Sequence, residues 1–291
     1  MHASRSRSIL LLAVASRAAT AFSPRGLRER KPNGRRAPPF PTAFQTATPF
    51  GTCVAVTLPP LPHPHAALLA EQSLELEAQL AEAELHADEA RHMRSLPLAQ
   101  RVLFAGSRVA MRRARHGLAR ALPVLPDALG APAMPAGWHG SISHTQGLAA
   151  ALACGRAARE GGGRRRRGIG IDVESTSRSI SPRVPRRCLA ADERESLGRV
   201  NHLDARADAL LRFSLKEALY KATHPLVRAS IPWHSVTVWP AADGGCRVDA
   251  STLEKSLQVR LQLEAQWEER EGFFVSTAAV ELLELPERTP S

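Results

Sequence analysis

Gly170-Ile-Asp-Val-Glu174 is the stretch of this 291-residue sequence from which its fold can be worked out. The β-branched residues in and before it predict a buried strand over 168–174. Side chains two residues apart on a strand point to the same side, so Asp172 and Glu174 project together. Two carboxylates on one face repel each other unless a cation lies between them. The pair is therefore a candidate site for a divalent metal ion such as Mg²⁺, which binds oxygen ligands.

A second stretch, Phe213-Ser-Leu-Lys-Glu-Ala-Leu-Tyr-Lys221, has the spacing of an amphipathic helix. Glu217 and Lys221 are four residues apart and share one face. Leucines at 211, 215 and 219 form the opposite stripe, which predicts the buried side. Taken alone, a Glu–Lys pair at this spacing is more often a surface ion pair, and an Asp-x-Glu pair is more often an exposed strand end.

A third stretch, Gly140-Ser-Ile-Ser-His-Thr145, reads as a loop of small residues. Such a loop can bring backbone N–H groups and hydroxyls close to a phosphate, with Ser143 and His144 as the side-chain contacts. A structural histidine is the default interpretation of this stretch by itself. The three stretches together predict a site for Mg²⁺ and a pyrophosphate.

The rest of the chain indicates a mixed fold. Helices are expected over 66–93 and 98–122 and, in two pieces, over 192–223. Strands are expected over 168–174, 232–239, 257–263 and 273–283, and either a strand or a buried helix over 148–154. Pro123 to Pro135 reads as a loop. Helices segregated from mostly antiparallel strands point to the α+β class.

The positive charge of the chain is concentrated at its N-terminus. The whole sequence has a formal net charge of +11, but residues 1–50 hold nine Lys and Arg and one acid, for a net charge of +8. The remaining residues carry a net charge of +3 (30 basic and 27 acidic). Net charge is therefore weak evidence for nucleic-acid binding.

Two further classes are excluded by the sequence. The four cysteines lie far apart without a C-x-x-C pair, which argues against a zinc ribbon or a thioredoxin-like site. No apolar run reaches the roughly 18–20 residues that span a bilayer, so no membrane association of the mature protein is expected.

The N-terminal arm has the composition of a targeting sequence. Met1 to Ala21 combines a basic start, a short apolar run and a small-residue ending typical of signal-peptide cleavage. Residues 22–50 are basic and poor in acids, as transit peptides are. Together they resemble the two-part plastid presequences of algae with secondary plastids. We therefore expect residues 1–50 to be a presequence outside the fold and the protein to be plastid-located; the alternatives are a disordered basic tail, ordinary secretion or a cytoplasmic protein.

The motifs also resemble a known family, the 4′-phosphopantetheinyl transferases of the type that activates enterobactin and surfactin synthetases. That family's signature is G-I-D-x-E followed by F-S-x-K-E-[AS]-x-x-K, which 170–174 and 213–221 match without a mismatch. The stretch 140–144 resembles its G-S-[IL]-S-H motif, and 101–114 its R-x-x-F-x-x-[GS]-R helix. The resemblance covers about residues 75 to 245.

The resemblance implies an architecture and an activity. It implies two similar α+β halves related by a pseudo-twofold axis, over 51–167 and 168–291, which join near Arg164 to Gly168 in a monomer. Coenzyme A would bind in the cleft between them. The activity would be that of a holo-[acyl-carrier-protein] synthase, which moves the 4′-phosphopantetheine arm of coenzyme A to a serine of an apo acyl carrier protein or of a carrier domain in a polyketide or peptide synthase. The other product would be adenosine 3′,5′-bisphosphate.

The resemblance also assigns the site. It makes Asp172, Glu174 and Glu217 the Mg²⁺ ligands, and we expect Glu217 and Lys221 to act in catalysis, Glu217 as the general base. The expected contacts to the phosphates of coenzyme A are the following side chains: Arg108, Ser143, His144, Lys216 and Lys221.

Two other functions remain as alternatives. The first is a basic nucleic-acid-binding module that uses the N-terminal arm and the loop at Arg164–Arg167. It predicts aromatic residues interleaved with basic ones, yet Tyr220 is the only tyrosine, so no nucleic-acid partner is expected. The second is a Mg²⁺ nuclease built on the same three carboxylates, which leaves Lys216 and Lys221 unexplained.

Overall fold

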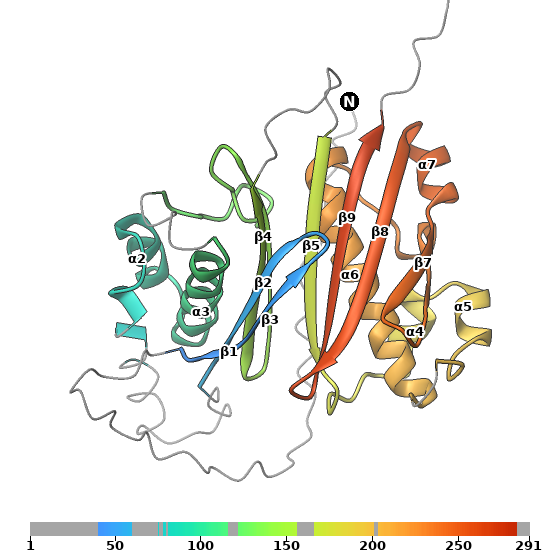
Figure 1. The fold of residues 1–291 in the computed structure, drawn as a ribbon, viewed down its shortest axis with the longest axis horizontal. Coiled ribbons are helices and arrows are strands. Elements are labelled where there is room, and N and C mark those ends of the chain that lie inside the picture. The colour runs from blue at the N-terminus through green and yellow to red at the C-terminus, as the bar shows by residue number, and fades with distance from the viewer. Residues whose placement is uncertain are drawn as a thin grey trace, which may run out of the picture.

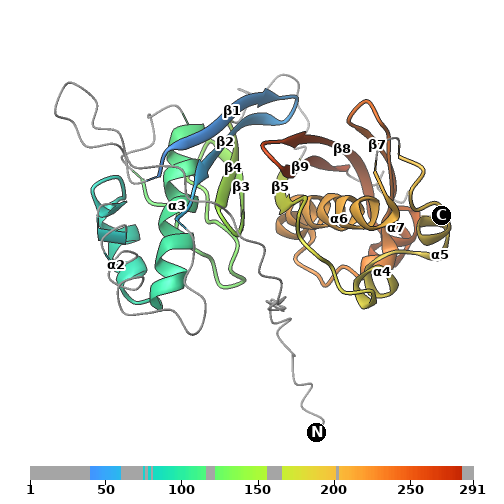
Figure 2. The same cartoon turned by 90° about the horizontal axis from the view of Figure 1, so that it is seen from below.

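The chain forms two antiparallel sheets that face each other, with helices on the outer side of each (Figures 1 and 2). The computed structural model describes residues 40–59, 75, 78–79, 81–115, 122–155, 166–200 and 203–283. The layers run helix, sheet, sheet, helix, and no regular alternation of parallel strands and helices occurs in the described part. The α+β prediction is confirmed.

The first sheet has four strands in the order β1-β2-β4-β3. Its bounds are β1 (Thr42–Thr48), β2 (Gly51–Thr57), β3 (Trp138–Thr145) and β4 (Leu148–Gly155). Two helices cover its outer side, α2 (Ala87–Arg94) and α3 (Leu98–Ala114). α3 packs on β2 and β4 through buried alanine, valine and methionine side chains.

The second sheet has five strands in the order β5-β9-β8-β7-β6. Its bounds are β5 (Arg166–Ser175), β6 (Thr237–Pro240), β7 (Gly245–Asp249), β8 (Arg260–Arg270) and β9 (Phe273–Leu283). The helices are α4 (Arg183–Cys188), α5 (Ala191–Glu195), α6 (Ala205–Val227) and α7 (Ser251–Leu257). The long α6 lies across β5 and β9. Its predicted leucine stripe is confirmed, because Leu211, Leu215 and Leu219 are buried.

A shared hydrophobic layer joins the two sheets. Alternate residues of β5, among them Ile169, Ile171 and Val173, point away from α6 and pack against Phe44 and Leu152 of the first sheet. The intervening residues of β5 face α6 instead, as the period of a strand requires. The sequence therefore divides β5 into an apolar face for the sheet–sheet core and a face that carries Asp172 and Glu174.

Two glycines let α6 approach β5 closely. A Cβ atom on Gly170 would lie 1.8 Å from the carbonyl oxygen of Ala218, and one on Gly168 would lie 2.0 Å from that of Ala222. Both nearest atoms belong to the helix backbone, which cannot move aside as a side chain can by changing its rotamer. Glycine is therefore needed at these positions for the helix to reach the strand.

Several expectations about the elements are wrong. The presequence was expected to reach residue 50, but Phe40 is fully buried and Thr42–Thr48 form β1, so residues 40–50 belong to the fold. The stretch 140–145, expected as a loop, is part of the edge strand β3. Arg166 and Arg167, expected in a loop, begin β5, whereas Arg164 and the arm up to residue 39 lie outside the described residues.

Other boundaries shift by a few residues. Strand β9 matches the expected bounds, and the broken helix over 192–223 corresponds to α5 and α6. The strand expected over 257–263 begins only at Arg260, because 251–257 is helical. Within the described residues, no helix is both long and apolar enough to cross a membrane.

We predict that Gly170→Ala destabilises the protein by about 3 kcal/mol, because the methyl group must push α6 away from β5. Urea unfolding monitored by circular dichroism measures the change in the free energy of unfolding. Gly155→Ala is the matched control, since nothing lies within 4 Å of a Cβ there. Equal stability of the two variants would contradict the close approach of the helix.

Candidate functional site

The two predicted carboxylates of β5 lie side by side under α6. Asp172 and Glu174 are both buried, each with 5% of its surface exposed. Their place on the strand follows from the alternation described above, which gives the apolar side chains of β5 to the sheet–sheet core. The carboxylates therefore occupy the only other face of the strand.

Helix α6 brings Lys221 onto Asp172. The ammonium Nζ of Lys221 lies 2.7 Å from Oδ1 of Asp172 and also donates to the carbonyl oxygen of Ile171, at 3.1 Å. One turn earlier, the half-buried Glu217 lies on the same side of the helix. The predicted shared face of Glu217 and Lys221 is thus the face turned toward the carboxylates.

Strand β3 meets β5 through serine side chains rather than through paired backbones. Oγ of Ser141 accepts a hydrogen bond from the backbone N–H of Ile171, at 3.1 Å, and Oγ of Ser143 accepts one from that of Val173, at 3.3 Å. Ser143 also donates to Oδ1 of Asp172, at 2.8 Å, and its oxygen lies 3.0 Å from Nζ of Lys221. The first sheet therefore contributes directly to the site on the second.

An arginine that the sequence analysis did not identify holds the other carboxylate. Arg178, in the turn after β5, forms a short ion pair with Oε1 of Glu174. The two residues are four apart, but β5 ends between them, so the helical spacing rule gave no reason to pair them. Two cations, Lys221 and Arg178, thus neutralise one oxygen each on the carboxylates of β5.

Burial and mutual repulsion change the acidity of the site. The pKa of Glu174 rises to about 7, first because of burial and then because of the charge of Asp172, although Arg178 opposes the change. The pKa of Glu217 also rises to about 7, from burial, from Asp172 and from Glu174, with Lys221 acting in the opposite direction. The three carboxylates are therefore close enough to influence one another's ionisation.

The donor set at this place fits a divalent cation. Oδ2 of Asp172 and Oε2 of Glu174 are buried and have no hydrogen-bond partner among the described residues. In that same part of the chain, no group of three His, Cys, Asp or Glu side chains is arranged to hold a metal ion as it stands. Two orphaned carboxylate oxygens beside a third carboxylate are nevertheless the hard oxygen ligands that Mg²⁺ prefers.

The expected phosphate contact of Lys216 is wrong. Its Nζ is buried and makes three contacts, to Oε2 of Glu193 at 2.6 Å and to the carbonyl oxygens of Cys188 at 2.8 Å and Trp233 at 3.0 Å. An ammonium group has three donors, so none is left for a ligand. The pKa of Lys216 lies below its usual value, because the effect of burial outweighs the opposing contact with Glu193.

His144 stands at the edge of the site with its side chain open to solvent. Its pKa lies below the usual value, mainly because the surrounding protein displaces water and then because of the charge of Lys221. The exposed surface of the residue limits the first of these effects. A neutral imidazole at this position can donate or accept one hydrogen bond at each ring nitrogen.

Arg108 lies on α3 and faces the same region. Its Nε donates to the carbonyl oxygen of Val124, at 2.5 Å, and its guanidinium lies 4.2 Å above the ring of Phe104. Burial lowers its pKa to about 10, which leaves it charged at neutral pH. Its charge also contributes to lowering the pKa of His144, so the two side chains lie within electrostatic reach.

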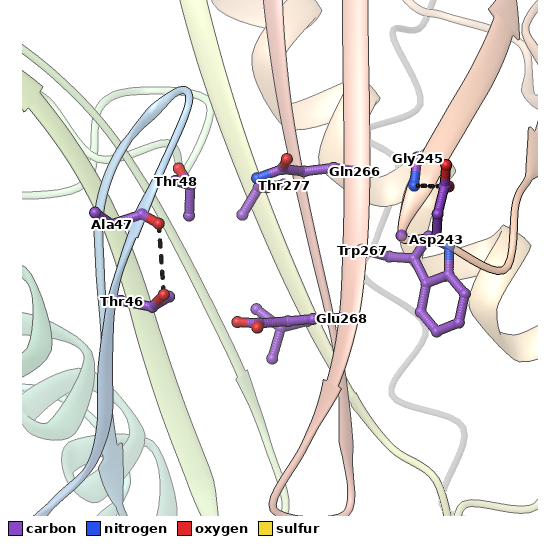
Figure 3. A pocket seen from close by; sticks show the side chains of 11 residues that line it. Thr46, Ala47, Thr48, Asp243, Gly245, Gln266, Trp267, Glu268 and Thr277 are labelled. Atoms are coloured by element: carbon purple, nitrogen blue, oxygen red, sulfur yellow. Dashed lines mark hydrogen bonds between the residues drawn. The ribbon is translucent and has the colours of Figure 1, made fainter.

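A cavity lies away from these groups. It has a volume of about 310 Å³ and opens between β1 and β8, with Thr46, Thr48, Gln266, Glu268 and Thr277 among its lining (Figure 3). Thr277 and its neighbour Val275 on β9 belong to the side of the sheet that faces β1, opposite to α6. The cavity is therefore separated from Asp172 and Glu174 by the sheet itself.

Two family models match the chain. Residues 168–278 match that of the 4′-phosphopantetheinyl transferase superfamily, and residues 88–154 match that of the 4′-phosphopantetheinyl transferase N-terminal domain. The first contains β5, α6 and the carboxylates, and the second contains α3 and β3. No curated protein matches the chain.

Several solved structures match about two fifths of the chain. An ACPS–CoA complex from Chronobacterium ammoniagenes is 16% identical, with a TM-score of 0.32, over 41% of this chain and 99% of the other. The holo-[acyl-carrier-protein] synthase of Neisseria meningitidis is 20% identical, with a TM-score of 0.32, over 40% and 98%. The acyl carrier protein synthase of Mycobacterium tuberculosis is 20% identical, with a TM-score of 0.29, over 40% and 97%.

We predict that the metal-free protein loses stability as the pH rises through the range from 4.5 to about 7. The folded pKa of Glu217 exceeds its ordinary value of 4.5, so the folded state keeps a proton that the unfolded chain has released. The resulting stabilisation is complete below pH 4.5 and is lost as the pH reaches about 7. Melting temperatures measured in a chelating buffer should fall less steeply in Glu217→Gln than in the wild type; identical slopes would contradict the raised pKa.

Proposed function

Because the chain belongs to the 4′-phosphopantetheinyl transferase superfamily, we propose that it transfers the 4′-phosphopantetheine arm of coenzyme A to a serine of an apo carrier protein. The observation that supports this most directly is the meeting of Asp172, Glu217 and Lys221 at the junction of β3, β5 and α6. β3 lies in the segment that matches the N-terminal domain model, and β5 and α6 lie in the segment that matches the superfamily model. The charges at their junction suit a pyrophosphate with a bound divalent cation.

The same proposal assigns the metal. Asp172, Glu174 and Glu217 would hold Mg²⁺, with Oδ2 of Asp172 and Oε2 of Glu174 as the oxygens that lack a partner among the described residues. When bound, the ion neutralises negative charge that develops on the pyrophosphate as the phosphorus–oxygen bond breaks. The chemistry of the donors, hard oxygen atoms without a thiolate, agrees with this choice.

Glu217 is the candidate general base. In the metal-free protein, burial and the charge of Asp172 raise its pKa to about 7, and a carboxylate at this place can accept the proton of an incoming serine hydroxyl. Glu217 is also half-buried rather than enclosed, so a partner's serine can reach it. Asp172 lacks this freedom, because Lys221 and Ser143 occupy one of its oxygens.

The remaining polar groups would bind the phosphates. Lys221 has a quarter of its side chain exposed and can exchange one of its present contacts for a phosphate oxygen. Ser143 and the exposed His144 flank it on β3, and Arg108 supplies a further positive charge from α3. Lys216 has no part in this set.

An acidic partner suits the surface beside the site. Helix α4, which lies next to α6 (Figure 2), carries three exposed arginines, Arg183, Arg186 and Arg187. A basic surface of this kind speeds the approach of an acidic protein and fixes its orientation. We propose that the carrier protein docks there, with its serine toward Glu217.

The activity is tested by incubating the protein with coenzyme A, Mg²⁺ and an apo acyl carrier protein. We expect the intact mass of the carrier to increase by one phosphopantetheine group. Glu217→Gln should lower the rate by roughly 10²–10³ while leaving the circular dichroism spectrum unchanged, since it removes charge from the site without removing volume. An unmodified carrier, or wild-type turnover in the variant, would refute the proposal.

We propose in addition that residues 1–39 direct the protein to a plastid. Their basic, acid-poor composition carries this proposal, and the full burial of Phe40 sets the limit of the segment that can be removed. A fluorescent protein fused behind residues 1–39 should enter plastids of an alga with secondary plastids, whereas a fusion to residues 22–39 alone should not. Cytoplasmic or secreted fluorescence from the longer fusion would contradict it.

A further inference from the structure

Lys216 belongs to the signature stretch of α6 but is turned away from the carboxylate site. With 4% of its surface exposed, it forms an ion pair with Glu193 of α5, which is fully buried. Oε1 of Glu193 accepts the backbone N–H of Val238 on β6, at 2.9 Å, and Oε2 accepts that of Ala190, at 2.7 Å. A buried ion pair that also satisfies backbone groups is costly to break from either side.

The pair ties α4 to α6. Nζ of Lys216 donates to the carbonyl oxygen of Cys188, the last residue of α4, and to that of Trp233 in the short 3₁₀ helix before β6. The ring of Phe213, one turn earlier on α6, stacks on that of Trp233 at 5.6 Å. The end of α4 is thus held by the residue next to Glu217 in the sequence.

A second ion pair repeats the arrangement one turn toward the start of α6. Arg212 pairs with Asp208, and its guanidinium also donates to the carbonyl oxygens of Val238, at 3.2 Å, and Ser196, at 3.3 Å. Val238 is therefore held at its N–H by Glu193 and at its oxygen by Arg212. This second pair fixes the strand and the loop after α5, whereas Lys216 is the residue of α6 that bonds the last residue of α4. Arg194 of α5 adds a hydrogen bond to the carbonyl oxygen of Leu189, which follows that residue.

We infer that Lys216, through Glu193, is a positioning residue that sets the arginine-bearing helix α4 relative to Glu217 and so governs the binding of the carrier protein rather than of coenzyme A. This inference rests on the proposed function. It assigns a role to a signature lysine whose three donors are all used inside the protein. Loss of the contact to Cys188 removes the hydrogen bond between α4 and α6, so that Arg186 and Arg187 can shift relative to Glu217. A displacement of about 1 Å is enough to cost a large factor in rate.

Steady-state kinetics separate the two roles of Lys216. In Lys216→Met and in Glu193→Gln, we expect the KM for the apo carrier to rise by about tenfold or more and the KM for coenzyme A to change by less than about twofold. Glu193→Gln keeps the volume of the side chain and supplies a second test if Lys216→Met fails to fold. Lys255→Met on the exposed surface of α7 is the matched control and should behave as the wild type.

The double variant Lys216→Met/Glu193→Gln gives a further check. Two residues of one pair are coupled, so the second substitution should add little to the first. If Lys216 contacted phosphate instead, Lys216→Met would raise the KM for coenzyme A. In the Glu193→Gln background, the same substitution would lower the rate by a further factor of roughly 10². Either of these results overturns the inference, whereas an inactive wild type overturns the proposed function.

Discussion

The site depends on the close contact between α6 and β5. Glycine at 168 and 170 lets the carbonyl oxygens of Ala222 and Ala218 lie almost on the strand, which brings the helix side chains within reach of Asp172. A larger residue at either position would separate Lys221 from its carboxylate. The G-I-D-x-E motif is therefore a packing motif as much as a chemical one, since its first residue sets a distance and its acids supply the charge.

The site also needs the first sheet. Ser141 and Ser143 satisfy backbone N–H groups of β5 that no neighbouring strand pairs with on that side, so the edge of one sheet is completed by side chains of the other. Ser143 then touches both Asp172 and Lys221. Relative movement of the two sheets would break all of these contacts, so the geometry of the site depends on how the sheets are packed.

The sequence predicted what depends on local periodicity. The alternation of β5 and the leucine stripe of α6 follow from period 2 and period 3.6, and the faces on which Asp172 and Glu217 lie were predicted correctly from them. β1 was missed because its threonine-rich sequence follows the basic arm and is equally poor in acids. β3 was missed because Gly140 and its serines are typical of loops. The pairing of Lys216 with Glu193 joins residues far apart in the chain and has no local pattern, so only the packed structure reveals it.

The apolar layer between the sheets draws on both ends of the chain, from Phe44 to Ala279. Each half hides one side of its sheet with its own helices and the other side only with its companion. The second half alone would expose Ile169, Ile171 and Val173 to water. An apolar surface of this kind promotes self-association. Because the two halves belong to one polypeptide, each half covers the apolar face of the other at any protein concentration.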